Sequence, residues 1–176
     1  GVINVNRPDH VKHWDAFVFL PHSLDALRKI AASDFRILVT TNQAAIARGL
    51  TTDAAVRDIH ARMTAEVARA GGRIDAVYYC PHHPDENCDC RKPRTGLYWQ
   101  GAREWNVDLT RSYVVGDALA DIVAAQVIGA AAILVLTGRG GEQHLALKEN
   151  NHAAYPVVDD LMSAVEWIGR KENIAL

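Results

Sequence analysis

The chain has 176 residues, of which 49% are hydrophobic and 23% charged, and its formal net charge at pH 7 is −2. These values are ordinary for one globular domain with a single substantial core. The near-neutral charge, without a Lys/Arg-rich run, argues against nucleic acid as a partner, and no apolar stretch approaches the roughly 20 residues needed to cross a membrane. We therefore expect one domain over residues 1–176 that binds neither nucleic acid nor membrane.

Short β-branched runs alternate with amphipathic stretches along the chain. The run RILVTT is typical of a buried parallel strand, and the stretch 51–72 has a Thr/Asp start, apolar residues on one face and a Gly-Gly stop, which predicts a helix. The same reasoning predicts strands at 36–41, 74–79, 112–117 and 131–136, with a short edge strand at 155–158. Further helices are expected at 21–32, 95–105, 119–128, 142–150 and 160–171.

Strands that alternate with helices predict an α/β fold of the Rossmann-like type, a parallel sheet between two helical layers. In such sheets ligands bind at the carboxyl ends of the strands. Four predicted strands end in residues suited to binding: Thr41-Asn42-Gln43, Cys80 onward, Gly116-Asp117 and Thr137-Gly138. Four such ends at one edge of a sheet indicate a functional site.

All three cysteines lie in CPHHPDENCDCRKP, residues 80–93. An odd, clustered set favours a metal over disulfides and indicates a reducing compartment, so we expect a cytoplasmic protein. Cys80, His82, Cys88 and Cys90 would form a closed tetrahedral set that suits a structural Zn²⁺. His83 competes with His82, but the C-x-H spacing mirrors C-x-C and favours His82. The alternatives are a polar loop with incidental cysteines and a redox pair, for which C-x-C has the wrong spacing.

Charged residues flank two of these strand ends. Arg91 and Lys92 follow the cysteine loop, which would fix them where they could neutralise a phosphate; alone, such a pair is usually a solvated surface feature. Asp117 could bind Mg²⁺ through its carboxylate or cap the next helix, and the residues leave both readings open. The hydroxyl of Thr41 could hold a phosphate oxygen, or Thr41 could be present only because threonine favours strands. Arg139 lies in a flexible basic loop after the fourth predicted strand.

Three motifs together resemble those of the haloacid dehalogenase-like (HAD-like) phosphatases, in their zinc-containing, capless branch. They are TNQAAIARG at 41–49, the cysteine loop through Lys92, and VGDALAD at 115–121. The resemblance implies that Thr41, Asn42 and Gln43 contact phosphate or substrate, that Lys92 neutralises the phosphate and that Arg91 contacts the substrate. It also implies that Asp117 binds Mg²⁺, that Asp121 supports the site, and that the stretch 4–12, through Asn6, Arg7 and Asp9, helps to select the substrate.

The nucleophile of that family is the first Asp of a D-x-D-G motif, and the second Asp is its general acid/base. No D-x-D occurs among the 176 residues. The resemblance aligns Gly1 with the glycine of the motif and places the motif at the end of a central strand between 36–41 and 112–116. We therefore expect this chain to be truncated at its start and to lack that central strand. We also expect that the chain cannot hold the native fold while the strand's place is empty, and that it is inactive by itself.

The resemblance implies a phosphatase that acts on a small sugar phosphate with Mg²⁺, as a monomer with a structural Zn²⁺. IARG at 46–49 and the CPHHP stretch favour a heptose bisphosphate over histidinol phosphate, although Ala44 and Ala118 each remove a possible polar contact. A hypothesis of another class is a non-catalytic, zinc-stabilised binding domain that has lost its chemistry.

Overall fold

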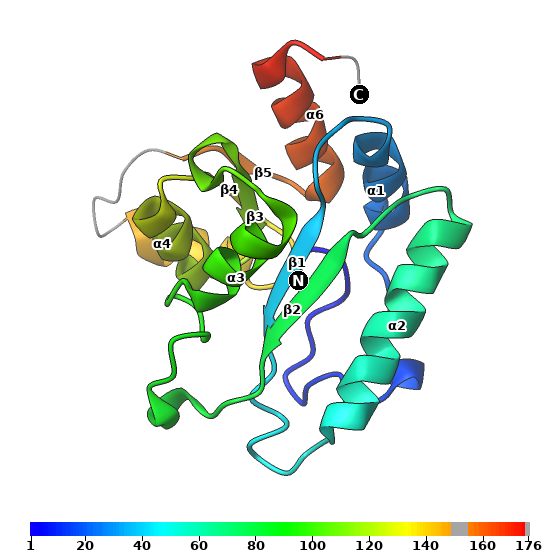
Figure 1. Cartoon of the computed structure of the whole chain (residues 1–176), viewed down its shortest axis with the longest axis vertical. Helices are drawn as coiled ribbons and strands as arrows, with labels where there is room; N and C mark the ends of the chain where they lie inside the picture. Colours follow the sequence, from blue (N-terminus) through cyan, green and yellow to red (C-terminus); the bar gives the residue numbers. More distant parts are fainter. Residues whose placement is uncertain (149–154, 175–176) are drawn as a thin grey trace.

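A computed structural model describes residues 1–148 and 155–174 of the chain (Figure 1). Its strands are β1 (Leu38–Asn42), β2 (Ala76–Cys80), β3 (Tyr113–Gly116), β4 (Ala131–Val135) and β5 (Val157–Val158). Its helices are α1 (Ser23–Ala31), α2 (Asp53–Arg69), α3 (Gly96–Trp105), α4 (Leu119–Ile128), α5 (Gly140–Lys148) and α6 (Leu161–Glu172). Each predicted element is present with ends shifted by at most three residues, and the last two residues of the helix predicted at 142–150 lie outside the described residues.

Local signals explain where α2 forms. Thr52 caps the helix, because its hydroxyl accepts a hydrogen bond from the backbone N–H of Ala55 at 3.1 Å. The buried side chains of α2 recur every three or four residues and pack one face of the helix on the core: Val56, Ile59, Met63 and Val67. Among the described residues, no helix combines the length and apolar character needed to cross a bilayer.

The strands form two parallel sheets. β1 pairs with β2 in a register that runs from Leu38 opposite Ala76 to Asn42 opposite Cys80. The second sheet has the order β3-β4-β5 and is also parallel. Helices α1, α2 and α6 lie on one side of the strands, and α3 and α4 lie on the other (Figure 1). The parallel α/β prediction is therefore confirmed, in a three-layer arrangement.

The two sheets do not join. Within the described residues no strand pairing links β1 to β3, and a cavity of about 1630 Å³ lies between their facing edges. Residues of both strands line this cavity, Leu38 and Thr40 among those from β1 and Tyr113 and Val115 among those from β3. We call the space between the two strand edges the β1–β3 slot. Its place agrees with the expectation that the central strand is missing from these residues.

In the part of the chain that the structure describes, no strand pairs with the backbone groups of β1 and β3 that face the slot. A buried N–H or C=O without a hydrogen bond costs about 1–3 kcal/mol, whereas the net stability of a domain is only about 5–15 kcal/mol. A few such groups would therefore offset a large share of the stability of the chain. That the chain alone cannot hold the native fold stays a prediction.

One buried histidine makes the stability of the fold depend on pH. His60 of α2 packs edge-on against Tyr79 of β2, with ring centroids 5.3 Å apart, and burial lowers its pKa from 6.5 to about 4. Between these two values the unfolded chain binds the extra proton, so this contribution to stability is fully present above about pH 6.5 and is lost as the pH falls toward 4.

When the pH is lowered from 7.5 to 4.5, the unfolding free energy of both proteins should fall. We predict that this decrease is about 2 kcal/mol smaller in the His60→Gln variant than in the parent chain. Urea unfolding at the two pH values measures this difference, and carboxyl groups titrate in both proteins and cancel in the comparison. Equal losses in the two proteins would show that folding leaves the proton affinity of His60 unchanged.

Candidate active site and zinc cluster

A buried ion pair forms the centre of the candidate site. Lys92 Nζ lies 2.7 Å from Asp121 Oδ1, and the two side chains are only 13% and 8% exposed. The ammonium also donates a hydrogen bond of 2.7 Å to the carbonyl oxygen of Thr40, at the end of β1. Burial by itself would lower the pKa of Lys92, but the Asp121 carboxylate outweighs it and the pKa is raised. Lys92 is therefore a permanent cation with one N–H left for another acceptor.

Asn42 holds the backbone of Lys92 in place. Its side-chain Nδ2 donates to the carbonyl oxygen of Lys92 at 3.1 Å, and its Oδ1 accepts from the N–H of Lys92 at 3.0 Å. This two-point contact joins the carboxyl end of β1 to the residue that follows the cysteine loop. Both polar groups of the Asn42 side chain are occupied in this way, so here it positions Lys92. Its predicted contact with phosphate stays a prediction.

Thr41 and Gln43 lie beside this pair. Gln43 Nε2 donates to Thr41 Oγ1 at 3.3 Å, and the backbone N–H of Gln43 donates to the carbonyl oxygen of Cys80 at 2.7 Å. The cavity between the sheets is lined by most of the predicted site residues: Asn6, Arg7, Thr41, Asn42, Gln43, Lys92, Asp117 and Asp121. Arg91 is not among the lining residues, and its Nη1 lies 3.5 Å from the carbonyl oxygen of His82.

Asp117 and Asp121 have different roles. Helix α4 begins at Leu119, and Asp121 Oδ2 accepts a hydrogen bond from the N–H of Ala118, just before the helix, at 3.2 Å. Asp121 therefore caps α4, and the alternative that Asp117 is the cap is wrong. Asp117 Oδ2 instead accepts from the N–H of Arg139 at 3.0 Å, which leaves its second carboxylate oxygen without a protein donor among the described residues. A carboxylate at a strand end, 15% exposed and beside a cavity, fits a Mg²⁺ ligand.

Two glycines let the carboxylates approach the backbone. A Cβ at Gly116 would lie 2.2 Å from Cβ of Asp121, and one at Gly138 would lie 2.3 Å from Asp117 Oδ2. Gly138 also has φ +61°, which disfavours other residues. Nearby, the hydroxyl of Thr137 donates to the carbonyl oxygen of Gly1 at 2.7 Å and holds the start of the chain at this edge. No pattern in the sequence indicated that contact.

The stretch 4–12 lines the cavity in part, through Asn6 and Arg7 among others. Arg7 Nε lies 3.2 Å from Asp9 Oδ1, and Lys12 Nζ lies 3.8 Å from Asp9 Oδ2. The Arg7 guanidinium lowers the pKa of Asp9 through its hydrogen bond. Asp9 therefore pairs with both cations of the stretch, which keeps a net positive charge, and the substrate-selecting role of the exposed Asn6 and Arg7 stays a prediction.

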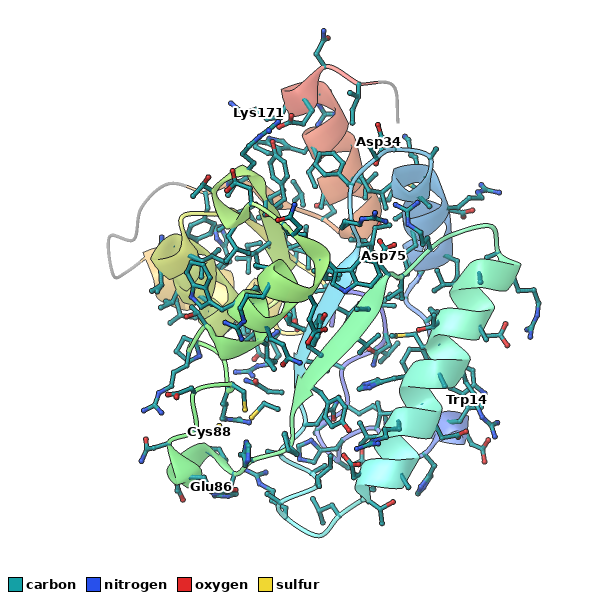
Figure 2. The ribbon with its side chains drawn as sticks, in the orientation of Figure 1. Trp14, Asp34, Asp75, Glu86, Cys88 and Lys171 are labelled. Atoms are coloured by element: carbon teal, nitrogen blue, oxygen red, sulfur yellow. The ribbon has the colours of Figure 1, made fainter. Side chains whose placement is uncertain are left out.

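The four predicted zinc ligands converge in the loop after β2. His82 Nδ1 lies 3.2 Å from Cys90 Sγ and 3.6 Å from Cys80 Sγ, while Cys88 Sγ lies 3.5 Å and 3.4 Å from the sulfurs of Cys80 and Cys90. Four ligands at about 2.3 Å from one zinc ion are about 3.8 Å apart in a tetrahedron, so this cluster could hold zinc. Figure 2 shows Cys88 in this loop beyond the carboxyl end of β2, with Asp75 at the opposite end.

His83 has another role. Its Nδ1 accepts a hydrogen bond of 3.4 Å from the N–H of Asp85, and it precedes the short 3₁₀ turn Pro84–Glu86. Glu86 reaches back to the N–H of His83 and completes a capping box. The structure therefore favours His82 over His83 as the fourth ligand.

Comparisons with known proteins agree with this geometry. The HAD-hydrolase-like family model matches residues 89–164. Two similar relatives are D-glycero-β-D-manno-heptose-1,7-bisphosphate 7-phosphatases. The enzyme of Bordetella bronchiseptica is 42% identical, over 80% of this chain and 78% of its own length. The enzyme of Pseudomonas aeruginosa is 39% identical, over 80% of this chain and 79% of its own length. The enzyme of Neisseria meningitidis serogroup A is 34% identical over 99% of this chain and 93% of its own.

The chain belongs to the HAD-like phosphatases. Among solved structures, the heptose bisphosphate phosphatase of B. bronchiseptica, complexed with magnesium and phosphate, is 37% identical with a TM-score of 0.90. That match covers 97% of this chain and 94% of the other. The corresponding enzyme of Burkholderia thailandensis is 30% identical with a TM-score of 0.69, over 93% and 95% of the two chains. The HAD-like fold inferred from the motifs is confirmed, and its capless character stays a prediction.

The zinc cluster gives a prediction that separates His82 from His83. We expect about one zinc per chain by metal analysis, and we expect Cys88→Ser and His82→Asn to lower both zinc content and thermal stability, because binding energy at such a site is folding energy. His83→Asn is the matched control, since Asn can still cap the short turn. Zinc loss in the His83 variant with retention in the His82 variant would reverse the assignment.

The buried ion pair gives a second prediction. Asp121→Asn should lower the unfolding free energy by about 3–5 kcal/mol, because it leaves the buried ammonium of Lys92 without a counter-charge. Adding Lys92→Met to that variant should recover much of the loss, and Asp117→Asn, which leaves the Lys92–Asp121 pair intact, should cost less than Asp121→Asn. Denaturant unfolding of these three variants, of Lys92→Met alone and of the parent measures all of these effects. Strict additivity of the Lys92 and Asp121 substitutions would contradict a coupled pair.

Proposed function

We propose that this protein is a Mg²⁺-dependent phosphatase that removes the 7-phosphate of D-glycero-D-manno-heptose 1,7-bisphosphate and releases the 1-phosphate. The observation that carries the proposal is the buried cation of Lys92, whose pKa is raised. Lys92 and Asp117 line the same cavity, at the carboxyl ends of β1 and β3. Relatives at 34–42% identity over 80–99% of the chain carry that enzyme name.

The site residues divide the work of binding a phosphate. Lys92 directs an ammonium N–H at the anion and neutralises the charge that develops in the transition state. Asn42 keeps Lys92 in position, Asp121 keeps it charged, and Thr41 presents its hydroxyl to a phosphate oxygen. Asp117 would hold Mg²⁺, which supplies charge neutralisation between an anionic nucleophile and an anionic phosphate. Arg91 and the stretch 4–12 would contact the sugar.

The nucleophile is proposed from the resemblance. A carboxylate of an Asp-x-Asp segment ahead of Gly1 would attack phosphorus from the carboxyl end of the β1–β3 slot, where Lys92 and Asp117 lie. The sugar oxygen leaves with a proton from the second aspartic acid, and an aspartyl-phosphate forms. Water then attacks that phosphorus, releases inorganic phosphate and restores the carboxylate.

The substrate preference rests on the relatives and the motifs. The IARG stretch and the CPHHP stretch favour the heptose bisphosphate, and histidinol phosphate is the alternative. Ala44 is buried and only 6% exposed, so a polar residue at this position would gain little access to a sugar. The absence of a polar side chain there is therefore weak evidence against the heptose substrate. The proposal also places the enzyme in the cytoplasm, because zinc thiolates persist in a reducing compartment. That it is a monomer is proposed from the family resemblance.

The proposal predicts which chain releases phosphate and from what. We would measure inorganic phosphate release from heptose 1,7-bisphosphate and from histidinol phosphate, with Mg²⁺, for the 176-residue chain and for a chain extended at its start by the corresponding segment of a relative. We expect activity only in the extended chain, preferentially on the heptose substrate and lower by at least 10²-fold in Asp117→Asn.

Three results would contradict the proposal in different ways. Equal activity of the two chains would contradict a nucleophile ahead of Gly1, and a preference for histidinol phosphate would favour the alternative substrate. An extended chain that folds and binds zinc without releasing phosphate from either substrate would favour a non-catalytic binding domain. Omission of Mg²⁺ from the active chain is the matched control for the role of the metal.

A further inference from the structure

Residues 6–17 leave a short antiparallel pair of backbone segments and return to it. The N–H of Val5 donates to the carbonyl oxygen of Val18 at 2.8 Å, and the N–H of Leu20 donates to that of Ile3 at 2.9 Å. We call residues 6–17 the 6–17 excursion. These pairings fix where the excursion begins and ends, so its path between the two points depends on other contacts.

The second half of the excursion is held by packing. Trp14 stacks on Phe17 with ring centroids 5.1 Å apart, and Phe17 packs edge-on against Phe19. The short 3₁₀ turn Trp14–Ala16 also contacts α2. Figure 2 shows Trp14 beside α2, toward the end of the molecule where Cys88 lies. Aromatic packing and the contact with α2 therefore fix this half of the excursion.

The first half, residues 6–12, is polar and is held differently. Its N–H of His10 donates to the carbonyl oxygen of Arg7 at 3.1 Å, and His10 has φ +65°. A residue other than glycine keeps such a conformation only where its surroundings fix it. Among the described residues, one hydrogen bond joins residues 6–12 to another part of the chain. In it, the Thr51 hydroxyl donates to the carbonyl oxygen of Lys12 at 2.8 Å.

Thr51 is itself fixed on both sides. The residue after it, Thr52, caps α2. In the loop before it, the N–H of Ala47 donates to the carbonyl oxygen of Pro81, in the cysteine loop, at 3.2 Å. The hydroxyl of Thr51 is therefore a donor on a rigid support, and its bond to Lys12 ties residues 6–12 to that support.

We propose that Thr51 is a positioning residue for substrate binding, an inference that rests on the proposed function. Its hydroxyl holds residues 6–12 so that Arg7 meets the part of the substrate remote from the reacting phosphate. Arg7 lines the same cavity as Lys92 and Asp117, and residues 6–12 carry a net positive charge, which suits an anionic substrate. Without the Thr51 bond these residues are ordered only when substrate binds, and that ordering weakens binding.

The test compares Thr51→Val and Thr51→Ser in the extended chain described above. Valine keeps the shape of the side chain and removes the donor, whereas serine keeps the donor and is the matched control. In Thr51→Val we expect the KM for heptose 1,7-bisphosphate to rise by about three- to tenfold, the effect of one hydrogen bond. The kcat should stay within about twofold, because the contact is lost equally from the ground state and the transition state. For p-nitrophenyl phosphate, which has no sugar, kcat/KM should be the same in the parent and both variants.

Limited digestion with trypsin tests the same bond without any substrate. Trypsin cleaves after Lys12, the residue whose carbonyl oxygen accepts from Thr51. In Thr51→Val we expect this cleavage to be faster by about threefold or more, because local opening exposes the segment. Thr51→Ser should be cleaved like the parent, and cleavage after the other basic residues is the internal reference for overall stability.

Several results would overturn the role of Thr51. These are an unchanged KM in Thr51→Val, an equal rise in Thr51→Ser, or unchanged cleavage after Lys12. An equal loss of activity on p-nitrophenyl phosphate would overturn it as well, because it would show that Thr51 supports the whole fold. Each of these results leaves the proposed function standing when the parent releases phosphate from heptose 1,7-bisphosphate. A parent extended chain that releases none from this substrate would overturn the proposed function and this inference with it.

Discussion

The buried ammonium of Lys92 is the group on which the site depends. It lies in a part of the molecule where an unpaired charge would be strongly disfavoured, and Asp121 and the Thr40 carbonyl together make its burial tolerable. Asp121 belongs to α4, the helix that follows β3, and Thr40 belongs to β1, which lies in the other sheet. One cation therefore ties the edge of the β1–β2 sheet to the helix that follows β3. The same burial makes the charge effective, because an ion pair or anion contact is stronger where water is excluded.

The zinc cluster acts on the same residue through the chain. Cys90 is two residues before Lys92, so a metal that fixes the loop also fixes the approach of Lys92 to the sheet. Asn42 closes the other side, since it binds the N–H and the C=O of Lys92 together. Arg94 adds to this by donating to the carbonyl oxygen of Cys88 at 3.1 Å. Hydrogen bonds to backbone atoms thus define the shape of this loop, and a metal held by the cluster would fix it further.

The sequence predicted the elements well because their signals are local. Helices and strands are signalled within a few residues, by apolar periodicity, by the Thr52 cap and by the glycines after helices. The cysteine cluster is equally local, because its four ligands lie within eleven residues of one another. The role of Asn42 could not be read in this way, because it arises from a contact with backbone atoms 50 residues away. The choice between a cap and a metal ligand at Asp117 was equally open. The structure removes the cap alternative, because Asp121 reaches back to Ala118 and takes the cap, and the Mg²⁺ role of Asp117 stays a prediction. Likewise, the pairing of Arg7 with Asp9 depends on the fold of one short stretch, which no spacing rule describes.

The strand slot and the phosphate site share an atom. The carbonyl of Thr40 faces the slot, and in a complete sheet it would be available to a neighbouring strand, yet here it accepts from Lys92. The ammonium of Lys92 therefore lies at the edge of β1 that faces the slot, on the same cavity as Asp117. In a parallel sheet the carboxyl ends of the strands are where loops gather and where ligands bind. The hydrogen bond between Lys92 and Thr40 thus links the edge of β1 that faces the slot to the candidate site at the carboxyl ends of the strands.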